Sequence, residues 1–153
     1  MKYTDEPVVE SFLPKVETVT TRRTVINDSS QDPQTPLVER VRHGLPMAEF
    51  HALLKLLALS EEELGRLLGI SPATLNRRKK GARLTMAESE RVVRFARLFG
   101  LAMEVFEDEE AACEWLKTAN PGTAGEQPLS YADTEFGARE VENLLGRIDH
   151  GIF

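Results

Sequence analysis

The chain has 153 residues, enough for one domain or two small ones, and its 19 basic and 25 acidic residues give a formal net charge of −6. A single cysteine, Cys113, excludes an internal disulfide framework and a cysteine-only metal cluster. Because no stretch approaches the ~20 apolar residues that span a bilayer and the first ten residues do not look like a signal peptide, we expect a cytoplasmic protein.

The charge is distributed unevenly along the chain. Residues 1–36 have a net charge of −2. Residues 37–100 contain twelve basic and seven acidic residues, whereas residues 101–153 contain three basic and twelve acidic ones. The middle therefore has a net charge of +5 and the C-terminal third one of −9. This asymmetry indicates two surfaces with different partners, although acidic helices that only keep a small domain soluble would give the same pattern.

The first 36 residues are the part of the chain that we expect to be least ordered. They contain four prolines and a polar run at residues 27–32, which interrupt every apolar group. Threonine and valine are frequent between residues 16 and 26, but their alternation is too irregular for more than a weak indication of a strand. We therefore predict a flexible N-terminal arm over residues 1–36.

From residue 37 onward the apolar residues recur with a helical period, which predicts an all-α fold. A helix over residues 37–43 ends at Gly44 and a second begins at Pro46, because glycine commonly ends helices and proline fits their first turn. A third follows a capping box made by Ser60 and Glu63, in which each side chain accepts a hydrogen bond from the backbone amide of the other residue.

The sharpest local signal is a pair of short helices joined at Gly69, the arrangement of a helix-turn-helix. Gly65 supplies the small residue needed where the helices cross, and Gly69 tolerates the positive φ of the turn. The second helix exposes short polar and basic side chains that suit base edges and phosphates, although a helical hairpin with a solvated cationic end would look the same. The candidate DNA-binding residues are Ser71, Thr74, Asn76, Arg77, Arg78, Lys79 and Lys80.

A fifth helix is predicted to run from a second capping box, formed by Thr85 and Glu88, to Gly100. Arg91 and Arg97 lie on a basic stripe of this helix. Such a stripe suits phosphates, but it is more often a solvated helix face. We therefore leave both readings of these arginines open.

The C-terminal third is predicted to contain two further helices. The first has acids at residues 108–110 in its first turn and Lys117 in its last, as the helix dipole favours. A loop follows over residues 120–128, and the final helix begins near Thr134. Gly137 has no evident packing role in the sequence, other than to permit the close approach of another backbone.

The residues give little support to catalysis. The three histidines lack metal-ligand spacing, and Cys113 stands beside Glu114, which disfavours a reactive thiolate. Ser71 belongs to a helix cap, and the sequence has no glycine-rich phosphate loop. We therefore expect a protein that is not an enzyme, with no cofactor and no bound metal.

Several blocks of the sequence together match one family pattern. They are Gly69–Arg78, Leu84, Glu88–Arg94, Trp115–Leu116, Thr134–Val141 and Leu145–Gly151. These blocks resemble the Xre/MbcA/ParS group of antitoxins, the partners of RES-domain toxins. The resemblance covers roughly residues 40–153, and the closing block is more specific than a helix-turn-helix, which many repressors share. The loop at residues 120–127 departs from the family pattern, and residues 1–36 match no family.

The resemblance implies an Xre-like helix-turn-helix bundle at residues 37–101 and a small helical toxin-binding domain at residues 102–153. Such antitoxins bind their own operator DNA with the first part and neutralise a toxin that consumes NAD with the second. An acidic end suits a toxin whose NAD site is expected to be cationic. The residues expected to cover that site are Arg139, Glu142, Arg147, Asp149, Gly151, Ile152 and Phe153.

Two other functions remain open at this point. One is a stand-alone helix-turn-helix transcription regulator with an acidic oligomerisation or ligand-binding domain. The other is an interaction module whose helix-turn-helix no longer contacts DNA. Because palindromic operators require two-fold symmetry, we expect a homodimer in either DNA-binding case.

Overall fold

The computed structural model describes residues 7–13, 34–81 and 83–151. The regular elements of this described part are all helical, as predicted, and a single antiparallel bridge pairs Pro46 with Arg83. None of its helices combines the length and the apolar character needed to cross a membrane. The elements are η1 (Val9–Phe12), α1 (Gln34–His43), α2 (Met47–Leu57), α3 (Glu61–Leu68), α4 (Pro72–Arg78), α5 (Met86–Phe106), α6 (Glu109–Lys117), η2 (Pro121–Thr123), α7 (Pro128–Tyr131) and α8 (Glu135–Asp149).

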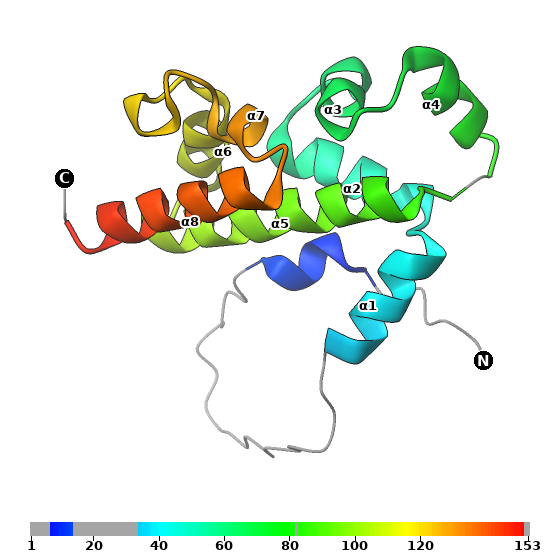
Figure 1. Cartoon of the computed structure of the whole chain (residues 1–153), viewed down its shortest axis with the longest axis horizontal. Helices are drawn as coiled ribbons and strands as arrows, with labels where there is room; N and C mark the ends of the chain where they lie inside the picture. Colours follow the sequence, from blue (N-terminus) through cyan, green and yellow to red (C-terminus); the bar gives the residue numbers. More distant parts are fainter. Residues whose placement is uncertain (1–6, 14–33, 82, 152–153) are drawn as a thin grey trace.

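The central element is α5, which packs against η1, α1, α2, α3, α6 and α8. Figure 1 shows it running through the middle of the molecule, with α2, α3 and α4 above one half and α6 and α7 above the other. Buried apolar side chains from all of these regions form one continuous core. The boundary predicted between residues 101 and 102 falls inside α5. The two predicted domains are therefore built on one shared helix.

The prediction that the fifth helix ends at Gly100 was wrong. α5 continues to Phe106 and ends with Glu107 in the left-handed region, at a φ of 54°. Gly100 is buried where η1 crosses the helix, and a Cβ there would lie 2.2 Å from the carbonyl oxygen of Phe12. This glycine permits a close approach between backbones, which a sequence cannot distinguish from a helix stop.

Residues 7–13 are anchored to the core, which corrects the prediction of a flexible arm for this stretch. Val8 and Val9 are buried, and their N–H groups donate to the two carboxylate oxygens of Glu49 at 2.8 and 3.0 Å. Glu49 is itself only 4% exposed, so the first residues of η1 replace water around its charge. Residues 34–36 of the predicted arm form the start of α1, which also differs from the prediction. Residues 1–6 and 14–33, with the weakly indicated strand, lie outside the described residues.

The helix starts predicted from capping residues are confirmed. In α3 the N–H of Glu63 donates to the hydroxyl of Ser60 at 3.2 Å, and the N–H of Ser60 donates to the Glu63 carboxylate at 2.9 Å. The hydrogen bond from the backbone N–H of Ser60, followed by the Ser60 hydroxyl, lowers the pKa of Glu63. Thr85 and Glu88 form the same box at the start of α5, and Thr134 caps α8. Local side-chain chemistry therefore sets where these three helices begin.

Candidate nucleic-acid and partner-binding surfaces

α3 and α4 form the helix-turn-helix that the sequence predicted. α3 ends at Gly69, which has a φ of 73°, and α4 begins after the Ser71 cap. A Cβ on Gly65 would lie 3.2 Å from the carbonyl oxygen of Ile70, so the glycine keeps the elbow tight. The angle between the helices is filled by four buried apolar side chains, Leu64, Leu68, Ile70 and Leu75.

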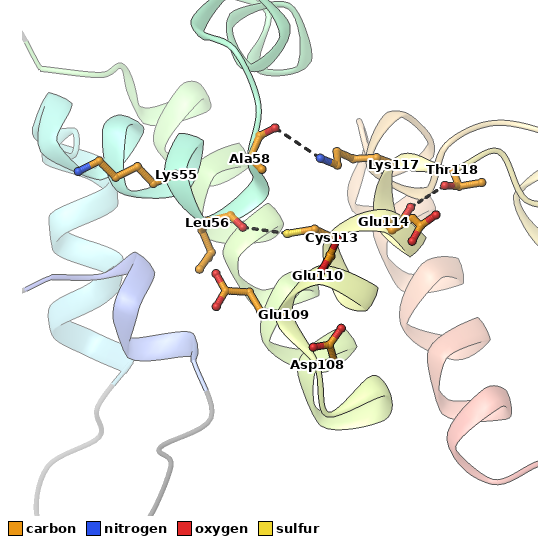
Figure 2. A pocket seen from close by; sticks show the side chains of 10 residues that line it. All are labelled: Lys55, Leu56, Ala58, Asp108, Glu109, Glu110, Cys113, Glu114, Lys117 and Thr118. Carbon is orange, nitrogen blue, oxygen red and sulfur yellow. Dashed lines mark hydrogen bonds between the residues drawn. The ribbon is translucent and has the colours of Figure 1, made fainter.

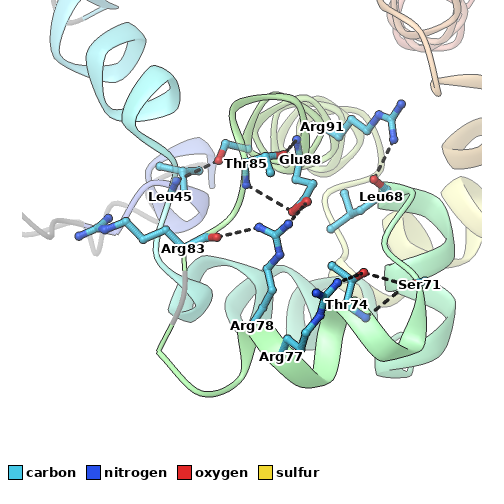
Figure 3. Close-up of polar contacts among 11 residues, drawn as sticks. Leu45, Leu68, Ser71, Thr74, Arg77, Arg78, Arg83, Thr85, Glu88 and Arg91 are labelled. Carbon is cyan, nitrogen blue, oxygen red and sulfur yellow. Dashed lines mark hydrogen bonds and ion pairs between the residues drawn. The ribbon is translucent and has the colours of Figure 1, made fainter.

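Polar side chains of α4 are linked to one another on its outer face (Figure 3). The hydroxyl of Ser71 accepts from the N–H of Thr74 at 3.2 Å and donates to Oγ1 of Thr74 at 2.9 Å. The guanidinium of Arg77 donates to the same Oγ1 at 3.2 Å. Asn76 and Arg77 are exposed. The face thus presents an amide and a guanidinium, the groups that read base edges in a major groove.

Arg78 differs from Arg77, which bonds to Thr74 one turn away, because it contacts residues that follow α4 in the chain. Its Nη2 lies 2.9 Å from the carboxylate of Glu88, and its Nη1 donates to the carbonyl oxygen of Arg83 at 2.8 Å (Figure 3). The side chain of Arg78 is 17% exposed. Arg78 was predicted to contact DNA, but in the structure it ties the end of α4 to the start of α5.

The two lysines that follow α4 also differ from each other. Lys79 forms an ion pair with Glu61 of α3, so its charge is partly neutralised within the helix-turn-helix. The side chain of Lys80 is exposed and forms no hydrogen bond or ion pair with the residues that the structure describes. Of the predicted DNA-binding cations, Arg77 and Lys80 are therefore the most accessible.

The basic stripe of α5 holds neighbouring helices in place. Arg91 donates to the carbonyl oxygen of Leu68, at the end of α3, at 2.7 Å. Arg94 and Arg97 both donate to the carboxylate of Glu135, the first residue of α8, at 3.1 and 2.9 Å. These arginines are therefore not simply solvated, because they contact residues up to 41 positions away in the sequence. A contact of the stripe with phosphates stays a prediction.

The acids of α8 that face α5 complete this network. The Nε of Arg97 lies 2.8 Å from the carboxylate of Glu142, an ion pair that lacks the alignment of a hydrogen bond. Glu142 was predicted to contact a toxin, but it is half-buried and paired within the chain. Partial burial raises the pKa of Glu135, and the hydrogen bonds and charges of Arg97 and Arg94 outweigh that effect, so its pKa is lowered.

The start of α8 is packed closely against the loop that precedes it. A Cβ on Gly137 would lie 1.8 Å from the carbonyl oxygen of Tyr131, which confirms the predicted close approach of two backbones. Among the predicted toxin-binding residues, Arg139, Arg147, Asp149 and Gly151 are exposed, whereas Ile152 and Phe153 lie outside the described residues.

Phe136 is the residue that the sequence analysis missed. Its side chain is 82% exposed on the first turn of α8. The helical period already contained the signal, because Phe136 lies on the side of the helix opposite the apolar positions Val141 and Leu145.

An acidic groove lies between the end of α2 and α6 (Figure 2). Four acids of the α6 region line it, and the thiol of Cys113 donates to the carbonyl oxygen of Leu56 at 2.9 Å. Burial raises the pKa of this thiol, so the cysteine is protonated and unreactive at neutral pH. The described residues contain no group of histidine, cysteine or acidic side chains arranged to hold a metal ion.

The comparisons with known proteins divide the chain in two. Residues 36–97 match the antitoxin Xre-like helix-turn-helix domain, and residues 101–151 match the antitoxin Xre/MbcA/ParS C-terminal toxin-binding domain. An antitoxin Xre of Photorhabdus laumondii is 34% identical over 90% of this chain and 93% of its own length. An antitoxin Xre of Yersinia enterocolitica is also 34% identical, over 78% and 82%. A protein of a Sphingobium species named Prs ADP-ribosylating antitoxin is 24% identical over 74% and 77%.

Proposed function

This chain belongs to the Xre antitoxin family, and from that premise we propose that it neutralises a RES-domain toxin and represses its own operon. As an antitoxin of a toxin–antitoxin system it has a cognate toxin as partner. We place its action in the cytoplasm, where it meets both the toxin and the promoter DNA. In this proposal it contributes no catalytic residue of its own.

The proposed contact with the toxin is made by the C-terminal region. The observation that carries it is that α8 packs one face on α5 and leaves exposed several polar residues that lead to the end of the chain. The name of the Sphingobium relative couples the word antitoxin to ADP-ribosylation, a reaction that uses NAD. A toxin site that binds the phosphates of NAD is expected to be cationic, and the acidic C-terminal third would complement it. We propose that Gly151, Ile152 and Phe153 cover that site.

A truncated chain tests this arrangement. The chain and the product of the neighbouring reading frame are co-expressed, and growth and co-purification are measured for the full-length chain and for a variant without Ile152 and Phe153. We expect the variant to keep its melting temperature and to lose most of its protection. Full protection by the variant would contradict the covering role of these residues. If the full-length chain neither protects nor co-purifies, the proposed neutralisation of the neighbouring product fails.

The proposed contact with DNA is made by α4. Because Asn76 and Arg77 are exposed on one face, we propose that they read bases while Lys80 contacts a phosphate. A homodimer would place two such helices on the two halves of a palindromic operator. Binding to the chain's own promoter is expected to weaken steeply as salt increases.

Two alanine variants separate the roles of these residues on DNA. Arg77→Ala is expected to weaken specific binding by roughly 1–3 kcal/mol and to relax the preference at one base position. Lys80→Ala is expected mainly to lower the slope of affinity against salt. Unchanged sequence preference in the Arg77 variant would contradict this docking. Promoter binding by a chain that protects against no toxin would indicate a stand-alone regulator.

A further inference from the structure

The outward face of α8 is a single stripe along the helix. With about 100° between successive residues, positions 136, 140, 143, 147 and 150 all point within about 40° of one direction. The buried positions Val141 and Leu145 point to the opposite side, toward α5. The stripe consists of five exposed side chains, Phe136, Glu140, Asn143, Arg147 and His150.

One end of this stripe carries an apolar protrusion. The Phe136 side chain is 82% exposed, whereas the next most exposed large apolar side chains of the described residues are those of Met86 at 49% and Val38 at 45%. A large aromatic side chain of this kind can act as an interface anchor when a pocket of a partner buries it.

The other part of the stripe is hollowed. A shallow recess there is lined by Glu140, Glu142, Asn143, Gly146, Arg147 and His150. A Cβ on Gly146 would meet no atom of the described residues within 4 Å, so nothing in that part of the chain requires a glycine at this position. Glycine inside a helix lowers helix stability relative to other residues. A contact outside the chain therefore explains Gly146 better than packing within it.

We propose that the toxin docks along this stripe, with Phe136 in an apolar recess of the toxin and a toxin side chain in the hollow over Gly146. The inference rests on the proposed toxin-neutralising function and adds a second attachment to the one made by the C-terminal residues. Phe136 and Gly146 are ten residues apart, which is about 15 Å along the helix.

Two observations favour the toxin as the occupant of this face. The stripe lies within residues 101–151, which match a toxin-binding domain, and it continues directly into the proposed covering residues. Glu140 and Arg147 form no ion pair within the described part of the chain. They are therefore available to pair with a partner on either side of the hollow. A second copy of this chain is the competing occupant.

The experiment compares two variants on the stripe with one outside it. The affinity of the full-length chain for the purified product of the neighbouring reading frame is measured by calorimetry, together with melting temperature and oligomeric state. We expect Phe136→Ala to weaken binding at least about 30-fold, as an interface anchor does. Gly146→Leu is expected to weaken it at least about tenfold while raising the melting temperature, because leucine favours helix formation. Met86→Ala, which also removes an exposed apolar side chain, is the matched control and is expected to bind normally.

The outcomes distinguish this inference from the proposed function. If the wild-type chain binds tightly and both stripe variants bind equally well, the stripe is not the docking surface and the proposed function stands. If Phe136→Ala changes only the oligomeric state, the face belongs to a second copy and the inference is overturned. If the wild-type chain itself does not bind, the proposed function fails and this inference fails with it.

Discussion

The two helices that face outward, α4 and α8, are held against α5 by different means. α4 is held by side chains, chiefly Arg78, which joins Glu88 and the carbonyl oxygen of Arg83. α8 is held against α5 by the arginine pairs with Glu135 and Glu142, and against the end of α7 by a close approach of backbones at Gly137. Side-chain contacts lose strength gradually when they are altered, whereas a close backbone approach leaves no room for even one methyl group.

The outward faces of α4 and α8 also differ, in the kinds of groups that they present. The face of α4 presents polar groups that are already linked by hydrogen bonds, whereas the face of α8 presents an exposed ring and a hollow. Polar and cationic groups suit nucleic acid, and an apolar protrusion beside a hollow suits a protein surface. The two faces therefore suit the two different partners that we propose for helices sharing one supporting helix.

Gly137→Ala is the substitution that should disturb this comparison most. The added Cβ would lie 1.8 Å from the carbonyl oxygen of Tyr131, so the start of α8 must move away from α7. We expect a loss of about 3 kcal/mol in the free energy of unfolding, measured by urea denaturation. Binding to the toxin should weaken strongly, while binding to promoter DNA at low temperature should change little.

Gly146→Ala is the control for that substitution, because a methyl group at Gly146 would meet no atom within 4 Å among the residues that the structure describes. It is expected to raise the free energy of unfolding by up to about 1 kcal/mol, as alanine does in an exposed helix. Equal stability of the two variants would show that the close approach at Gly137 does not hold α8.

Arg78→Ala tests the other helix and should have the next largest effect. It leaves the partly buried carboxylate of Glu88 without its cation and frees the end of α4. We expect a loss of about 2 kcal/mol in the free energy of unfolding and weaker promoter binding with unchanged base preference. Arg77→Ala is the matched variant, because its exposed side chain should affect base preference and not stability. Equal melting temperatures would contradict the structural role given to Arg78.

Local patterns in the sequence predicted much of this fold, because the relevant atoms are close along the chain. The capping residues Ser60, Thr85 and Thr134 interact with amides three residues away, so their motifs predict the helix starts. The same reasoning failed at Gly100, where the cause is the carbonyl group of Phe12, 88 positions earlier.

Residues of the candidate surfaces were likewise predictable where their partners lie close along the chain, and not where the partners are distant in sequence. Arg77 was predicted from its place on a short polar helix, whereas the partner of Arg94 lies 41 residues away in sequence and gives no local signal. Phe136 was missed for a different reason. Its exposure follows from the helical period, but only charged and terminal residues of the C-terminal third were predicted to bind a partner.

Glu135→Gln should have the smallest effect, and that effect should depend on pH. The pKa of Glu135 is lowered in the folded chain, because Arg97 and Arg94 outweigh the effect of partial burial. A carboxyl group with a lowered pKa in the folded state stabilises that state at pH values above its unfolded pKa, and the stabilisation is lost as pH falls through the folded pKa. Its side chain is 53% exposed, so solvent screens the pair and we expect at most about 1 kcal/mol at neutral pH.

The measurement is the difference in melting temperature between the wild-type chain and Glu135→Gln across pH. The wild-type chain should be more stable at pH 7, and the difference should shrink as pH falls below 4.5, the ordinary pKa of this carboxyl group. High salt should reduce the difference at pH 7 as well, because the pair is partly exposed. A difference that stays constant with pH would mean that Glu135 contributes by packing rather than by charge. The attachment of α8 to α5 would then rest on the pair of Arg97 with Glu142 and on the buried apolar contacts.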